Sequence, residues 1–134
     1  MAHVTVGRVG DRVDAADVVG GRARVDRDYS PLGNPFVLSG EIDRDPACDA
    51  YELLLEATLG VGRARSVEGW TPSAIGAACG FRGEVRGWDW DAALDEMRRL
   101  RLLAGRGSLR LDCHCCPKRC HSESVRKHVV ACFR

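Results

Sequence analysis

Hydrophobic positions recur along the chain with two spacings, and each spacing predicts a different kind of element. The helical spacing is clearest in residues 45–60, where Asp45 is placed to cap a helix, Pro46 to open it and Gly60 to end it. The apolar residues of this segment recur every three or four positions and are Cys48, Tyr51, Leu55 and Leu59. We therefore expect a helix over 45–60 with one buried face.

Three further segments carry helical signals. A short helix over 71–79 is predicted to begin at Thr71 and Pro72, a longer one is expected over 91–105, and a last one over 122–132. Gly105 is placed to end the second of them. The expected buried positions are Leu94, Met97, Leu100 and Ala104 in the 91–105 helix and Val125, Val129 and Cys132 in the last helix.

Strand signals are shorter. Residues 3–6 and 18–25 are rich in β-branched side chains and bounded by turn residues, with a polar loop over 10–17 between them. In residues 108–115 the spacing is two, so alternate side chains share one face. These are Leu109, Leu111, Cys113 and Cys115. The two prolines and one glycine of 30–36 exclude a regular element there.

Strands that alternate with helices predict an α/β fold, a single compact domain in which a small, at least partly parallel sheet is flanked by helices, Rossmann-like in outline. A length of 134 residues fits one domain. Residues 61–90 hold all three tryptophans and are expected to form an inserted flap. Parallel sheets bind ligands at the carboxyl ends of their strands. The run of cysteines lies at the carboxyl end of the predicted 108–115 strand.

Composition places the chain among ordinary globular proteins, with 45% hydrophobic and 29% charged residues. No apolar run reaches the length of a membrane span, and the first residues lack the apolar core of a secretory signal. We expect a cytoplasmic protein without membrane contact. In a reducing compartment seven clustered cysteines favour metal binding or reactive thiols over disulfides, although an oxidising location stays open.

Charge is divided unevenly along the chain. Residues 1–97 hold 10 basic and 17 acidic side chains, whereas residues 98–134 hold 10 basic and 2 acidic ones. The basic end is also the cysteine-rich end. This asymmetry favours an anionic partner, either a nucleotide-like small molecule or nucleic acid, and the alternative is a solvated helix face.

The densest chemistry lies in 113-CHCCPKRCH-121. One interpretation is a metal site, because three thiolates and one imidazole are common structural zinc ligands. Its ligands would be Cys113, Cys115, Cys120 and His121. A second interpretation is catalytic: Cys120 follows two basic residues and precedes a helix, which lowers a thiol pKa, and His121 or His114 is the proton acceptor. The third is that the cysteines only pack in the core.

The second unusual segment is 27-RDYSPLGNPF-36. Arg27 and Ser30 offer groups that hold an anion, Gly33 permits a positive φ, and the Asn34 amide both donates and accepts hydrogen bonds. With Arg119 these residues form the candidate ligand-binding set. The alternative is a structural turn that covers the core with Phe36.

These two segments together carry a resemblance. The chain resembles the family known as Domain of Unknown Function 4326, whose members show an Arg shortly before a GNPF loop and a C-x-C…P…CH run followed by a helix. The matching residues are Arg27, Gly33, Asn34, Pro35, Phe36, Cys113, Cys115, Pro117, Cys120 and His121. His114 stands where an aromatic residue is usual, and Cys116 is an additional thiol. The resemblance implies a compact α/β fold and no established activity.

Two functions are compatible with these observations. The first is an α/β protein that binds or processes a nucleotide or nucleoside derivative between the GNPF loop and the Cys/His cluster. The second is a non-catalytic module, stabilised by zinc, that binds nucleic acid or protein through its basic end. Its cationic residues would be Arg98, Arg99, Arg101, Arg106 and Arg110. The first function requires Asn34 or Ser30 to lie near Cys113, Cys120 or His121.

Overall fold

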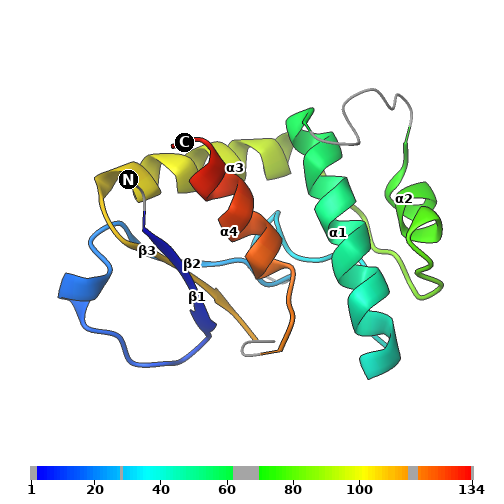
Figure 1. Cartoon of the computed structure of the whole chain (residues 1–134), viewed down its shortest axis with the longest axis horizontal. Coiled ribbons are helices and arrows are strands. Elements are labelled where there is room, and N and C mark those ends of the chain that lie inside the picture. Colours follow the sequence, from blue (N-terminus) through cyan, green and yellow to red (C-terminus); the bar gives the residue numbers. More distant parts are fainter. Residues whose placement is uncertain (1–2, 28, 62–69, 115–117, 134) are drawn as a thin grey trace.

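The structure, a computed structural model of the chain, describes residues 3–27, 29–61, 70–114 and 118–133. Its sheet has three strands, β1 (Val4–Arg8), β2 (Gly21–Arg24) and β3 (Leu109–Cys113), which lie side by side in the order β1-β3-β2 (Figure 1). Both pairings are parallel. The strand that comes last in the sequence is therefore the central one, and the predicted α/β fold with a small parallel sheet is confirmed.

The register brings the carboxyl ends of the strands to one edge. Leu109 pairs with Val4 on one side and with Gly21 on the other, so all three strands start at the same level. Along β3 the side chains of Leu109, Leu111 and Cys113 are buried, as the alternating pattern predicts. The backbone that follows β2 and β3 thus emerges at a common edge.

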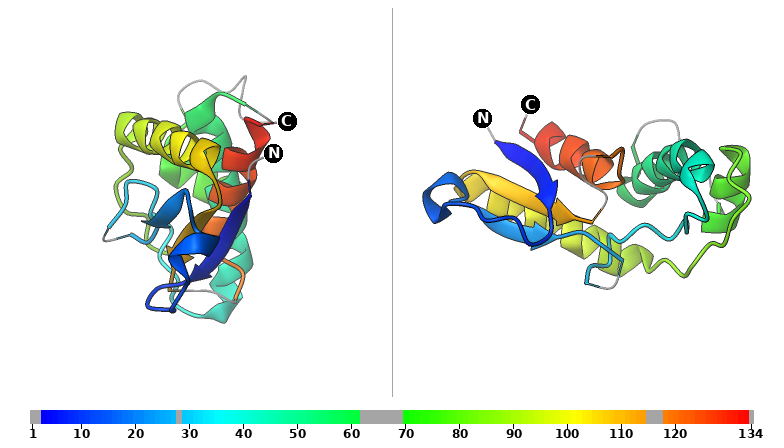
Figure 2. Two further views of the ribbon diagram at one scale, coloured as in Figure 1. Left: turned by 90° about the vertical axis from the view of Figure 1, so that its left-hand side faces the viewer. Right: turned by 90° about the horizontal axis from the view of Figure 1, so that it is seen from below.

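Four helices complete the domain: α1 (Arg44–Leu59), α2 (Pro72–Ala78), α3 (Trp90–Arg106) and α4 (Ser122–Ala131). Two short 3-10 helices, Ala15–Asp17 and Glu41–Asp43, lie in the loops. The sheet lies at one end of the molecule and α1 and α2 at the other (Figures 1 and 2). Helix α4 packs on β1 and β3, and α3 contacts both α4 and α1. None of the described helices is long and apolar enough to cross a membrane.

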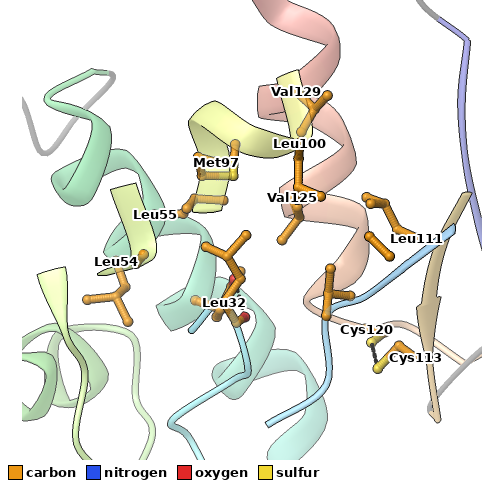
Figure 3. Close-up of a cluster of buried hydrophobic side chains, with 14 of the residues drawn as sticks. Leu32, Leu54, Leu55, Met97, Leu100, Leu111, Cys113, Cys120, Val125 and Val129 are labelled. Atoms are coloured by element: carbon orange, nitrogen blue, oxygen red, sulfur yellow. Dashed lines mark hydrogen bonds between the residues drawn. The ribbon is translucent and has the colours of Figure 1, made fainter. Parts of the chain in front are cut away.

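One hydrophobic core joins these layers (Figure 3). Leu54 and Leu55 of α1 meet Met97 and Leu100 of α3, and the β3 side chains complete the cluster at the sheet. Cys113 and Cys120 belong to the same buried cluster, at the border between the sheet and α4. The cysteine-rich segment is therefore anchored in the core rather than displayed on the surface.

Helix α1 begins earlier than its pattern predicts. Arg44 is the first helical residue and Asp43 the N-cap, so Asp45 and Pro46 lie within the first turn instead of capping and opening the helix. The preceding 3-10 turn runs directly into the helix. A capping pattern in the sequence does not reveal this, so the predicted start of the helix is too late. At the other end the prediction is confirmed, because Gly60 adopts φ 68° and closes the helix in the left-handed conformation.

Helix α3 differs from its prediction at both ends. The Asp89 side chain caps it by accepting a hydrogen bond from the Ala92 amide, and the helix continues through Gly105 to Arg106. The predicted burial of Met97, Leu100 and Ala104 is confirmed, but the first buried position of the stripe is Ala93, whereas Leu94 is only half-buried. In α4 the predicted inward position of Cys132 is also wrong, since this cysteine lies just beyond the helix and is exposed.

The described part of the tryptophan-rich segment, residues 70–90, packs against α1. Helix α2 contacts α1, and the Phe81 ring meets the Phe36 ring edge-on with centroids 5.4 Å apart. Trp88 donates a hydrogen bond from Nε1 to Thr58 Oγ1 at 3.2 Å. An isolated antiparallel bridge pairs Phe36 with Val85. This segment therefore backs the GNPF loop and helps to fix its position.

Candidate functional site

A cavity of about 250 Å³ lies where the strand ends meet the first turns of two helices. The backbone that follows β2 supplies Asp26 and Arg27, and the end of β3 supplies Cys113 and His114. The lining is completed by Asn34, Phe36, Leu38, Arg44, Ala47, Cys48, Arg119, Cys120 and His121. Asn34 of the GNPF loop thus shares one cavity with Cys113, Cys120 and His121, which is the proximity that the first function requires.

Cys113, Cys120 and His121 form a compact group at this cavity. They come from the end of β3 and the start of α4, and they are 2%, 4% and 5% exposed. The two sulfur atoms lie 3.1 Å apart (Figure 3), and Cys120 Sγ lies 3.4 Å from His121 Nδ1. One ligand atom from each residue lies within 4.8 Å of the other two. Folding therefore brings together three residues that are good ligands for a soft or borderline metal.

A backbone carbonyl determines which His121 nitrogen faces the thiols. His121 Nε2 lies 2.6 Å from the Val25 carbonyl oxygen, which can only accept a hydrogen bond. The ring proton is therefore on Nε2, and Nδ1 presents its lone pair to Cys120. A metal-binding histidine commonly donates its second nitrogen to a carbonyl in this way. The same arrangement suits a base that accepts the thiol proton.

Tyr51 of α1 connects the loop to this group. Its ring meets the His121 ring at a centroid distance of 4.9 Å, and its hydroxyl donates to the Leu32 carbonyl at 2.6 Å. Burial raises the pKa of Tyr51 well above its ordinary value, so the phenol stays neutral and keeps this donor. The sequence pattern identifies Tyr51 only as a core residue of a helix. Its contacts make it a residue that positions both the loop and the imidazole.

An acidic and a basic side chain form a second polar group on the cavity wall. Two hydrogen bonds, of 2.9 and 2.7 Å, join Arg24 to the buried Asp26. Burial disfavours the Asp26 carboxylate, but the hydrogen bonds from Arg24, a backbone hydrogen bond and the positive charge of Arg24 together hold the pKa of Asp26 below its ordinary value. His114 Nε2 lies 3.2 Å from the Arg24 guanidinium and 3.5 Å from Asp26 Oδ2, so this imidazole adjoins both members of the pair. The negative charge of Asp26 is therefore balanced within the wall.

The GNPF loop is held by its own polar groups. Arg27 Nε donates to the Asn34 carbonyl at 2.9 Å, and Asn34 Oδ1 accepts from the Phe36 amide at 2.9 Å. Ser30 Oγ accepts from the Leu32 amide and does not line the cavity. Gly33 does not adopt a positive φ. It is needed because a Cβ atom would lie 2.1 Å from the Arg27 Cα atom. These contacts hold the loop in one conformation. Within the loop, the Asn34 side chain uses Oδ1 to accept the Phe36 amide.

The other cations at the cavity are engaged by acidic residues. Arg119 donates to Asp45 Oδ1 at 2.8 Å and to Asp49 Oδ1 at 2.7 Å. Arg44 forms two hydrogen bonds with Glu41 and donates a third to the Arg119 carbonyl. Among the residues that the structure describes, Arg27 is the arginine of this cavity that has no carboxylate partner. The anion-binding role predicted for Arg119 is therefore less well supported than that of Arg27.

The arginines of the predicted nucleic-acid surface are largely paired as well. Arg98 and Arg99 form ion pairs with the acidic residues three positions earlier in α3. Arg110 bonds Asp11 and Asp112 in the sheet region, and Arg101 donates to the His128 carbonyl. A phosphate backbone would have to compete with these partners. The cationic side chains that the nucleic-acid hypothesis requires on α3 are therefore mostly engaged within the protein.

Zinc fits the described part of the cluster. Tetrahedral zinc with bonds of about 2.3 Å to sulfur places two thiolates about 3.8 Å apart, so Cys113 and Cys120 would separate by less than 1 Å. His121 Nδ1 already faces Cys120 Sγ at 3.4 Å, and its Nε2 has the Val25 carbonyl as partner. The predicted fourth ligand, Cys115, lies outside the described residues. The donor set that is described would hold zinc and leave room for one further ligand.

Fold and site together define a small α/β protein with a polar cavity at the carboxyl edge of a parallel sheet and a buried Cys/His group beside it. A model of the family described as Domain of unknown function (DUF4326) matches residues 4–131, nearly the whole chain, and the protein belongs to this family. No curated protein and no protein of solved structure matched the chain significantly.

Proposed function

We propose that the protein binds a nucleotide-like anion in the cavity between the GNPF loop and the Cys/His group. The observation that carries this proposal is Arg27, a half-buried cation that lines the cavity without a carboxylate partner in the described chain. The start of α1 and the N-cap residue of α4, His121, also border the cavity, and the positive end of a helix dipole favours negative charge. These features favour a phosphate or carboxylate group next to Arg27.

The size of the cavity narrows the choice of ligand. A volume of about 250 Å³ is slightly below the roughly 300–1,000 Å³ of pockets for drug-sized ligands, which favours a nucleoside monophosphate or a smaller anion over a dinucleotide. Phe36 and Leu38 supply an apolar wall against which a base can pack, while the Asn34 amide supplies donors for its polar edge.

Calorimetric titration tests this proposal with the four common nucleoside 5′-monophosphates and with inorganic phosphate. We expect at least one monophosphate to bind, and Arg27→Gln to weaken it by at least about tenfold, because a hydrogen bond to a charged group contributes about 1.5–3 kcal/mol. Arg98→Gln makes the same charge change on an exposed, paired residue of α3 and should leave binding unchanged. Absence of binding by every monophosphate at about 1 mM would contradict the proposal.

Asn34 provides a second test within the same site. Asn34→Asp keeps the oxygen that accepts the Phe36 amide but removes the amide donor. If Asn34 recognises the ligand, affinity falls while the unfolding temperature stays close to that of the wild type. If inorganic phosphate binds with the same affinity as every monophosphate, the site recognises a simple anion and not the nucleoside.

We also propose that Cys113, Cys120 and His121 hold zinc. The support is their common burial, the short distances among them and the Val25 carbonyl that orients His121. A bound zinc makes Cys120 a ligand rather than a free nucleophile, whereas a metal-free pair leaves Cys120 with His121 as its base, as the catalytic interpretation requires. Elemental analysis of the purified protein separates the two: one zinc per chain supports the metal centre, and its absence favours the thiol–imidazole pair.

A further inference from the structure

A second group of ligand-type side chains lies away from the cavity, between α1 and α4. Glu52 and Glu56 stand one turn apart on α1, and His128 faces them from the last turn of α4. One ligand atom from each residue lies within 4.8 Å of the other two. These three residues are therefore clustered in the way that a metal site requires, although ordinary interhelical pairing would also bring two of them together.

Glu52 and His128 already have partners. Glu52 Oε1 lies 2.9 Å from His128 Nε2 and accepts a hydrogen bond from Lys127 Nζ at 2.9 Å. These contacts join the two helices and balance one of the two carboxylates. They leave the second carboxylate, that of Glu56, to be explained.

Glu56 is the unusual member of the group. It is 9% exposed, and its Oε2 atom is buried without any hydrogen-bond partner in the part of the chain that the structure describes. A buried carboxylate oxygen without a donor is costly, so it is rarely kept without a compensating ligand. A divalent cation is such a ligand, since it neutralises Glu56 and uses its free oxygen.

We propose that Glu52, Glu56 and His128 bind a divalent first-row transition metal ion, such as Mn²⁺ or Zn²⁺. Carboxylates and imidazole are hard or borderline donors, and both ions accept them as ligands. Mn²⁺ in particular prefers such donors to the soft thiolates of the Cys/His group. Ligands at about 2.0–2.2 Å from one ion lie roughly 3–4 Å apart, so small side-chain rotations suffice. The ion replaces the hydrogen bond between Glu52 and His128, and the neutral ring carries its proton on the other nitrogen.

The surface of the protein offers a route to this site. An open groove of about 590 Å³ runs between α1, α2 and α4 and is lined by Glu52, Ser124 and Lys127. A hydrated cation can therefore approach Glu52 from solvent before it meets the buried oxygen of Glu56. The site is separate from the Cys113, Cys120 and His121 group, and neither proposal depends on the other.

Titration of the chelator-treated protein with Mn²⁺, followed by the paramagnetic resonance signal of the free ion, tests the proposal, because thiolates are poor ligands for Mn²⁺ and the Cys/His group should not compete for it. We expect one Mn²⁺ per chain, and a loss of affinity of at least about tenfold in both Glu56→Gln and His128→Asn, since altering even the outer contacts of a metal site costs about 10–100-fold. Glu123→Gln makes the same change on an exposed residue of the same groove and should bind like the wild type.

Thermal unfolding of Glu56→Gln separates metal binding from a purely structural role. Without metal this variant should unfold at a higher temperature than the wild type, because it removes the charge of a buried carboxylate whose Oε2 atom has no hydrogen-bond partner among the described residues. With Mn²⁺ the wild type should gain stability and the variant should not. The proposal is overturned if the wild type binds no Mn²⁺ at about 1 mM, or if Glu56→Gln binds it as well as the wild type.

Discussion

Gly33 shows how one residue shapes the cavity wall. The position of its missing Cβ atom is 2.1 Å from the Arg27 Cα atom and 2.7 Å from the Arg27 backbone nitrogen. Backbone atoms cannot move aside as the end of a flexible side chain can. The close contact brings the two ends of the loop together, and the hydrogen bond from Arg27 Nε to the Asn34 carbonyl then completes the turn.

A methyl group at this position should therefore open the loop. We expect Gly33→Ala to lower the free energy of unfolding by about 2 kcal/mol or more, since overpacking a close contact costs roughly 1–3 kcal/mol. Gly40→Ala is the matched control, because a Cβ atom there meets nothing within 4 Å and its φ of −178° is ordinary extended backbone. Urea unfolding of both variants provides the measurement. Equal stability of the two would show that the loop relaxes freely around Gly33.

Among the helices, α1 and α3 begin in different ways. Asp43 at the start of α1 makes no side-chain capping bond, and that helix begins from a 3-10 turn. Asp89 at the start of α3 accepts a hydrogen bond of 3.0 Å from the Ala92 amide. Since α3 carries Met97 and Leu100 into the core, the cap contributes to an element on which α1 and α4 both pack.

Removal of this cap should destabilise the protein by about 1 kcal/mol, the usual cost of replacing an N-cap aspartate by alanine. Asp89→Ala tests the expectation, and Asp89→Asn serves as its control because asparagine retains the accepting oxygen. Chemical denaturation of both variants gives the difference. A loss of stability in Asp89→Asn equal to that in Asp89→Ala would attribute the effect to charge instead of the hydrogen bond.

At the scale of the whole molecule, the Cys/His group joins three parts of the chain. Cys113 ends the central strand, Cys120 precedes α4, and His121 reaches the Val25 carbonyl beyond β2. An ion held there would link the sheet to its covering helix. Because such an ion binds the folded chain and not the unfolded one, it stabilises the whole domain.

Zinc removal should accordingly lower the unfolding temperature. A metal present at about a hundred times its Kd adds about 2.7 kcal/mol, which for a domain of this size corresponds to roughly 10 °C. We expect treatment with a chelator to produce this shift in the wild type and in Cys132→Ser, whose cysteine is exposed and outside the group. Cys113→Ser should lose both the zinc and the shift. An unchanged unfolding temperature after chelation would argue that no structural zinc is present.

Much of this organisation follows from local sequence. Helical spacing correctly predicts that Cys48, Tyr51 and Leu55 are buried, although Leu59 at the end of the same face is only partly so. Alternation predicts that Leu109, Leu111 and Cys113 share the buried side of β3. Both signals depend on residues within a few positions of one another, so they can be read from the sequence without the tertiary structure. Cys113 lies only seven positions before Cys120 in the sequence, so the proximity of Cys120 and His121 to Cys113 is likewise favoured by local sequence.

Tertiary structure decided what depends on distant partners. Arg27 and Arg119 are equivalent cations in the sequence, yet only folding brings Asp45 and Asp49 to Arg119 and leaves Arg27 without a carboxylate among its described contacts. Glu56 and His128 lie 72 positions apart and meet only because α4 packs on α1. Contacts between charged groups that are distant in the sequence are determined by the packing of whole elements, and no local pattern records them.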